Sequence, residues 1–314
     1  MKMACLLTLL VCGSLTAAWG DDTPAVPAVP PAAEPAPSDS AVLLGELLEP
    51  LVGRPGTEAQ PAGETDLYSR PLQLLEALVR SGDTSRRLWI TQAYWKVSAA
   101  YASVRCCTAA IEQLEMIAPG GDHHDRATLD VATAAAKADL ADARAHLGGM
   151  QQELVDLARL PLGEPLPWPV DRPLAGPYQT HFDAIFATRT ATGRVRTIAR
   201  TLPARHEALE SRAAAVRAAA TAMAMAEADH AKGNRPIEAV IAAHAALVSQ
   251  QGEFLQATKA YNLDIAEYAM AVADLSVPDD RFVSMLIGTP IQWRQPPPAP
   301  PLPSRPATSG TLVP

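Results

Sequence analysis

The feature that most constrains the fold of this 314-residue chain is a seven-residue step of large apolar side chains. In the C-terminal half the step occupies Val240, Leu247, Phe254, Tyr261, Tyr268 and Leu275, flanked by Ile237, Ile241, Val248, Leu255, Ile265 and Val272. The preceding segment repeats the step at Val195, Leu202, Leu209, Val216 and Met223. A sustained step of seven is typical of α-helices that pack along one another through a single apolar seam. The sequence therefore predicts two long helices in contact.

The residues that join these two helices have the composition of a tight turn. Gly233 is predicted to end the first helix, where a positive φ is favoured, and Asn234 to cap the second. Pro236 suits the first turn of that second helix, and Arg235 is expected to extend beyond the helix ends. We therefore predict a rigid, exposed tip of Gly233, Asn234, Arg235 and Pro236 that contacts a partner protein. The alternative is that this tip only closes the hairpin.

A second pair of helices is predicted between residues 71 and 160. The first helix covers 71–118, with an interruption near Gly82 and a restart capped by Asp83 or Thr84. Its seam is Ile90, Val97, Val104 and Ile111, with Tyr94, Tyr101 and Leu114 between them. The second covers 125–159 and has two steps of seven: Thr133, Leu140, Leu147 and Leu154, and Leu129, Ala136, Ala143, Met150 and Leu157. Gly148 and Gly149 predict either a bend in this helix or the close approach of another backbone.

The turn of this first hairpin contains glycine and histidine. Gly120, Gly121 and Asp122 are predicted to form a second partner-contact tip. The adjacent His123 and His124 could bind Zn²⁺, but such a site needs three or four converging ligands. We therefore favour a polar tip whose aspartate caps the next helix, and we predict neither a metal nor a cofactor.

The remaining segments are short or rich in proline. Residues 161–202 are predicted to form a proline-rich crossover, fixed to the helices by Trp168 and Tyr178, and then a short helix. Pro203 is expected to start or kink the third long helix, which opens a second hairpin over 203–277. The predicted fold class is all-α, with two long, antiparallel, coiled-coil-like hairpins that resemble a duplication.

The ends of the chain indicate export. Residues 1–20 have the charged start, apolar run and small-residue cleavage site of a signal peptide. The run is too short to span a membrane, and a lipoprotein signal at Cys12 is disfavoured by the large residue before it. Residues 21–70 are predicted to form a Pro/Ala-rich tether with a short helix over 41–51. Residues 278–314 are predicted to be a disordered, proline-rich tail whose apolar segment 282–287 packs on the helices.

Charge and chemistry exclude several classes of protein. The net charge is −8, and no stretch is strongly basic, so we expect no nucleic-acid partner. Cys106 and Cys107 are adjacent, which disfavours a disulfide between them, and two small core residues are favoured over a redox site. The acidic pairs Glu227/Asp229 and Asp264/Glu267 are interpreted as a solvated face. No catalytic motif is present in the sequence, so we do not expect an enzyme.

A resemblance adds to this interpretation. The second hairpin resembles the second half of TolC-type outer-membrane efflux proteins at His230, Gly233, Ile237, Glu238, Ala239, Val240, Ala243, Gln250, Gln251, Tyr261, Asn262, Ile265, Ala266, Glu267 and Tyr268. In the first hairpin, Ala93, Tyr94 and Trp95 resemble the start of a first-half helix of that family. The resemblance covers residues 71–160 and 203–277. It departs from the family in one respect, because the alternating strands that form the outer-membrane barrel are not found in the sequence.

Two functions follow from the resemblance. The first is a component of an efflux or secretion assembly in the bacterial cell envelope, in the periplasm or at the outer membrane. Its hairpins would assemble into homo-oligomers, such as the trimers of that family, and its tips would contact a periplasmic adaptor. The second is a periplasmic helical scaffold or binding module without transport activity. The hairpin motifs favour the first function, and the missing strands favour the second.

Overall fold

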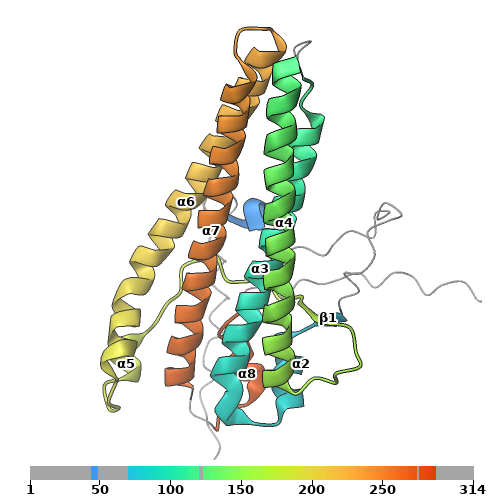
Figure 1. Ribbon diagram of the computed structural model, residues 1–314. Helices are drawn as coiled ribbons and strands as arrows, with labels where there is room; N and C mark the ends of the chain where they lie inside the picture. The colour runs from blue at the N-terminus through green and yellow to red at the C-terminus, as the bar shows by residue number, and fades with distance from the viewer. Residues whose placement is uncertain (1–43, 49–69, 120–122, 274–275, 288–314) are drawn as a thin grey trace, which may run out of the picture. The chain divides into compact units, whose positions relative to one another are not determined.

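The computed structural model describes residues 44–48, 70–119, 123–273 and 276–287. The chain divides into two units, residues 1–36 and 37–314, and all described residues belong to the second. Its elements, shown in Figure 1, are β1 (Arg70–Leu72), α2 (Leu74–Ser81), a 3-10 helix (Thr84–Arg86), α3 (Arg87–Met116), α4 (His123–Ala158), β2 (Pro167–Pro169), α5 (Phe182–Ile185), α6 (Gly193–Ala231), α7 (Ile237–Val272) and α8 (Asp279–Ser284). Most of the described chain is helical, which confirms the all-α fold class.

The four long helices lie in the order α6, α7, α3, α4, which we call the four-helix row. The contact between α6 and α7 is extensive, α7 also packs on α3, and α3 packs on α4. Buried residues make up about half of α3 but only a narrow stripe of the outer helices α4 and α6. The outer helices therefore each leave most of their surface exposed.

Ion pairs between neighbouring helices show in which direction each helix of the row runs. Lys96 pairs with Glu153 across α3 and α4, and Arg194 pairs with Glu267 across α6 and α7. In both pairs an early residue of one helix meets a late residue of the next, so neighbours run antiparallel. We call the end where α4 and α7 begin the tip end, and the end where α3 and α6 begin the base end (Figure 1).

The predicted seams form the core. Of the positions assigned by the seven-residue step, those buried in the structure are Val195, Leu202, Leu209, Val216 and Met223 of α6, Val240, Leu247, Phe254, Tyr261 and Tyr268 of α7, and Ile90, Val97, Val104 and Ile111 of α3. In α4 the outcome is mixed, because Leu129, Leu147 and Leu154 are buried while Leu140 is half-buried. Leu275 lies outside the described residues.

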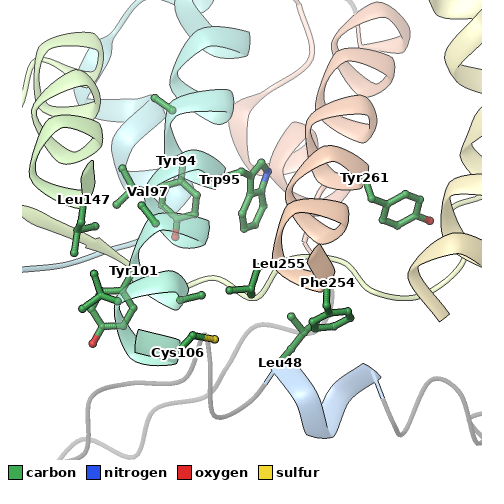
Figure 2. Close-up of a cluster of buried hydrophobic side chains, with 14 of the residues drawn as sticks. Leu48, Tyr94, Trp95, Val97, Tyr101, Cys106, Leu147, Phe254, Leu255 and Tyr261 are labelled. Carbon is green, nitrogen blue, oxygen red and sulfur yellow. The ribbon is translucent and has the colours of Figure 1, made fainter. Parts of the chain in front are cut away.

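The base half of the row contains the largest buried side chains. Figure 2 shows Trp95 between α3 and α7, and Leu48 reaching toward Phe254. Leu48 comes from residues 44–48, which are helical and lie within the predicted segment 41–51. Leu44 and Leu48 are both fully buried, so this short helix covers part of the core.

The crossover adds a small sheet to the base end. β1 and β2 pair in parallel, with Pro71 opposite Trp168, and each strand has three residues. Proline is tolerated there because both strands of a two-stranded sheet are edges. Trp168 packs on Tyr101 and Tyr178 on Tyr268, with ring centroids 5.5 and 6.0 Å apart. These contacts confirm the prediction that the two aromatics fix the crossover to the helices.

The hydroxyl of Tyr94 connects α3 to the crossover at the base end through several hydrogen bonds. Tyr94 Oη lies 2.7 Å from Asp171 Oδ2 and accepts hydrogen bonds from the backbone N–H groups of Val170 and Asp171. The same carboxylate accepts from the backbone N–H of Leu74, at 2.6 Å. Burial, and then the charge of Asp171, raise the pKa of Tyr94 far above its usual value, so the phenol stays neutral.

The segment after α7 packs against the start of α3. Phe282 of α8 is fully buried, as expected for the apolar segment 282–287. The Arg87 side chain is 2% exposed, pairs with Asp279 at 2.7 Å, and lies over the Phe282 ring. Residues 278–287 are therefore not part of a disordered tail, and residues 288–314 lie outside the described residues.

The prediction that the third long helix starts at Pro203 is wrong. Residues 181–200 do not form a separate helix, because α5 has four residues and α6 runs without a break from Gly193 through Pro203. Thr192 caps this start by accepting a hydrogen bond from the backbone N–H of Val195 at 3.3 Å. An interior proline costs about 3 kcal/mol. The uninterrupted seam of α6, buried on both sides of Pro203, offsets that cost.

Two glycine predictions have different outcomes. Gly82 ends α2 with φ of 61°, and Asp83 then accepts a hydrogen bond from the backbone N–H of Ser85, so the predicted interruption and restart are confirmed. Gly148 and Gly149 lie inside the continuous helix α4, and a Cβ on either would meet nothing within 4 Å. The close approach of another backbone is therefore not the reason for these two glycines.

Candidate functional site

The tip between α6 and α7 has the geometry of a helix C-terminal motif. Gly233 has φ of 75°, as predicted. Its N–H donates to the carbonyl of His230 at 2.8 Å, and the N–H of Asn234 donates to the carbonyl of Asp229 at 2.9 Å. Together these two bonds satisfy the last carbonyls of α6. Asn234 is therefore used to end α6, and the prediction that it caps α7 is wrong, since Pro236 occupies that position.

Two side chains at the end of α6, Asp229 and His230, contact the exposed tip residue Arg235. Arg235 Nε lies 3.4 Å from Asp229 Oδ2, and His230 Nδ1 lies 2.9 Å from the carbonyl oxygen of Arg235. All four predicted tip residues are exposed. The guanidinium is half exposed and held at one place, so it can present a cation to a partner without a large loss of side-chain freedom.

The starts of α4 and α7 lie at the same end of the row. Gly120, Gly121 and Asp122 lie outside the described residues, but His124 at the start of α4 has Nε2 2.7 Å from Glu238 Oε1 at the start of α7. A hydrogen bond from the backbone N–H of Glu238 itself, and then the His124 ring, lower the pKa of the Glu238 carboxyl. Within the described part of the chain, no three His, Cys, Asp or Glu side chains converge as metal ligands.

An apolar cleft lies below the tips, between α3, α4 and α7. Its volume is about 400 Å³. Alanine side chains line it on all three helices, namely Ala110 of α3, Ala132, Ala135 and Ala136 of α4, and Ala245 of α7. Larger seam residues elsewhere hold neighbouring helices about 8–10 Å apart, so alanines leave a gap between them. The cleft was not predicted, although the alanines at the α4 seam positions 136 and 143 are a signal for it.

The polar groups of this cleft are not arranged for nucleophilic catalysis. Cys107 and His244 both line it, but His244 Nε2 donates to the carbonyl of Ala110 at 3.0 Å. Burial, and then the negative charge of Asp139, raise the pKa of the Cys107 thiol, which opposes thiolate formation. Burial also raises the pKa of the neighbouring Cys106 thiol to about 12. Both thiols are free, in agreement with the interpretation of this pair as packing residues.

The acidic pair near the base is not a solvated face. The Asp264 side chain is 7% exposed, with Arg205 Nε 2.6 Å from Oδ2 and Arg194 Nη2 3.2 Å from Oδ1. Arg194 also donates to Glu267. Burial raises the pKa of Asp264, and the two arginines oppose that shift. The prediction of a solvated pair is therefore wrong for Asp264, whose charge is matched across α6 and α7.

Comparison with known proteins gives no relative from which a role for the tips or the cleft could be inferred. No protein-family model and no curated protein sequence matches the chain. None of the described helices is long and apolar enough to cross a membrane. The candidate functional surfaces are the tip at Gly233–Pro236 with the adjoining His124–Glu238 contact, the outer helices, and the cleft.

Proposed function

We propose that this chain is a TolC-like component of a cell-envelope efflux or secretion assembly, in which several copies associate side by side and their tips contact a periplasmic adaptor. The resemblance in both hairpins supports this proposal. The observation that carries it is the alternating direction of the helices along the row. Since α4 and α6 are antiparallel in such a row, α6 of a second copy can lie beside α4 and continue the alternation. Repeated contacts of this kind close into a ring when the rotation between neighbouring copies divides a full turn, and we propose that it does so here.

Exposed apolar side chains favour contact at the outer helices. Val131 on α4 is 71% exposed and Met225 on α6 is 61% exposed. Both lie toward the tip end, within about two turns of the end of their helices. A contact between the outer helices of two copies would remove both side chains from water, which is favourable.

Cysteine cross-linking tests this association. In a background that carries Cys106→Ala and Cys107→Ala, Val131→Cys together with Met225→Cys should give a ladder of cross-linked multiples with a short bis-maleimide, because each copy then carries both halves of the contact. A mixture of the two single variants should give dimers only. Val79→Cys is the control, because Val79 is 62% exposed on α2 at the base end, away from the tip-end positions of Val131 and Met225. Cross-linking of the paired variant no stronger than that of the control would reject the association.

The tip contact has a separate test. Arg235→Ala removes an exposed pair with Asp229 worth about 0–1 kcal/mol, so folding should be nearly unchanged. Capture of the adaptor from envelope extracts should weaken in this variant. Recovery of the same partners at the same yield would show that Arg235 is not the contact residue.

Export is part of the same proposal and rests on residues 1–20, which lie outside the described residues. We expect the purified envelope-fraction protein to lack these residues when its intact mass is measured. Full-length protein confined to the cytoplasm would contradict export.

A second candidate function is a helical scaffold or binding module without transport activity. The observation that favours it is the cleft between α3, α4 and α7, whose size is within the usual range of ligand pockets, about 300–1,000 Å³. A chain that stays monomeric and binds a small molecule would support this function over the first.

A further inference from the structure

We propose that the cleft between α3, α4 and α7 binds a small amphiphilic cation, with the apolar part of the ligand on the alanine-lined walls and its positive charge at the Asp139 carboxylate. This inference gives the second candidate function its ligand class. It concerns one copy of the chain, so its test is independent of association between copies.

The shape of the cleft suits an extended apolar group. Ala132 and Ala136 form one wall on α4, and Ile241 and Val248 form the opposite wall on α7. The half-buried Leu140 and Ala143 continue the α4 seam toward the base. An apolar ligand placed along this seam would remove apolar surface from water on both helices, which is the main favourable contribution to binding in such sites.

The charge of the cleft selects a cation. Among the described residues that line it, Asp139 is the only one with a formal charge when His244 is neutral. Burial lowers the pKa of His244, opposed by its bond to Ala110 and by Glu227, so the imidazole is neutral at pH 7. The field of Asp139 reaches into the cleft, because it raises the pKa of the Cys107 thiol. A ligand amine would match this carboxylate, and a ligand carboxylate would be repelled.

Cys107 provides the readout. It lines the cleft and is partly exposed, whereas Cys106 is buried. In a Cys106→Ala background, alkylation of the peptide by a small maleimide therefore reports access to Cys107. The probes are decylammonium, decanol and decanoate, used below their micelle concentrations, because they share one chain and differ in charge. Protection is followed by mass spectrometry as a function of probe concentration.

Decylammonium should protect Cys107 at a lower concentration than decanol, and decanoate should protect least. Asp139→Asn should weaken protection by decylammonium about twofold to fivefold, as expected for a partly exposed ion pair, and should leave decanol unchanged. Asp142→Asn is the matched control, since Asp142 is exposed on α4 but does not line the cleft. Ala136→Leu narrows the cleft and should sharply reduce protection by all three probes.

Three results would overturn the proposal. Equal protection by decylammonium and decanoate would remove the role of Asp139, and protection that persists in Ala136→Leu would place the probes elsewhere. A change in solution mass caused by Ala136→Leu without any probe would show that a second copy of the chain occupies the cleft. Urea denaturation of each variant checks that it is folded before alkylation is measured.

Discussion

The base half and the tip half of the four-helix row use the same seven-residue step with different side chains. At the base the seam positions hold Tyr94, Phe254 and Tyr268, which are fully buried, and the pocket between α3 and α7 there has a volume of only about 20 Å³. Toward the tip the α4 seam holds Ala136, and the cleft opens beside it. Periodicity therefore sets where helices meet, while side-chain volume sets whether they close on each other. The base buries the largest side chains of the row, and the tip half leaves apolar surface exposed in the cleft.

The largest difference in stability between the two halves is expected when leucines of one α4 seam are shortened to alanine. Leu147 is 1% exposed in the base half, whereas Leu140, seven residues earlier, is half-buried. Leu147→Ala should lower the free energy of unfolding by about 2–5 kcal/mol, because it leaves a cavity. Leu140→Ala should cost about 1 kcal/mol. Urea denaturation measures both, and equal losses would show that the two halves are packed alike.

The hydroxyl network at the base is expected to have the next largest effect. Tyr94→Phe keeps the ring but leaves the backbone N–H groups of Val170 and Asp171 without their acceptor. The free energy of unfolding should fall by about 1–3 kcal/mol. Tyr261→Phe is a milder control, because the two partners of its hydroxyl, the N–H of Tyr178 and the carbonyl of Gly176, belong to half-buried residues that water can reach. A Tyr94→Phe protein as stable as the wild type would refute the structural role of the hydroxyl.

Two glycine substitutions should change stability in opposite directions. Gly233→Ala at the tip places a Cβ at φ of 75° and should destabilise the protein by about 1–2 kcal/mol. Gly252→Ala, inside α7 where a Cβ would meet nothing within 4 Å, should stabilise it by about 0.5–1 kcal/mol. Thermal unfolding of both variants shows whether each substitution raises or lowers the stability of the protein. Destabilisation by Gly252→Ala would contradict the open helix surface described there.

The tip half is expected to respond to acid through His244. Because the folded state lowers the pKa of this residue below its usual value of 6.5, the unfolded chain binds the proton more readily. The stabilisation is complete above pH 6.5 and is lost as the pH falls below it. Gln at this position can still donate to the carbonyl of Ala110 and does not titrate. His244→Gln should therefore flatten the loss of stability below pH 6.5, and an unchanged pH profile would assign that loss to other groups.

Much of the fold could be predicted from local patterns. The seam residues, the positive φ of Gly233 and the restart at Asp83 each depend on a few neighbouring residues, so the sequence contains the information directly. Pro203 misled the prediction because its local cost is outweighed by burial along the whole of α6. The strand at Pro167–Pro169 escaped notice because it needs only three residues and a partner almost a hundred residues away.

The candidate sites were harder to predict because they depend on which helices become neighbours. His124 and Glu238 are separated by 114 residues, and no local pattern joins them. Asp264 is buried only because Arg194 and Arg205 of α6 face it. The cleft requires three helices, and the alanines that open it also have the simpler explanation of helix propensity.

The central claim, that copies of this chain associate through their outer helices, is tested most directly by the mass of the exported chain in solution. Sedimentation equilibrium over a wide range of protein concentrations measures it without labels. If contacts between α4 and α6 close a ring, the measured mass should reach one discrete multiple of the monomer mass and should not increase further as the protein concentration rises. A monomer mass at the highest concentration would contradict the claim.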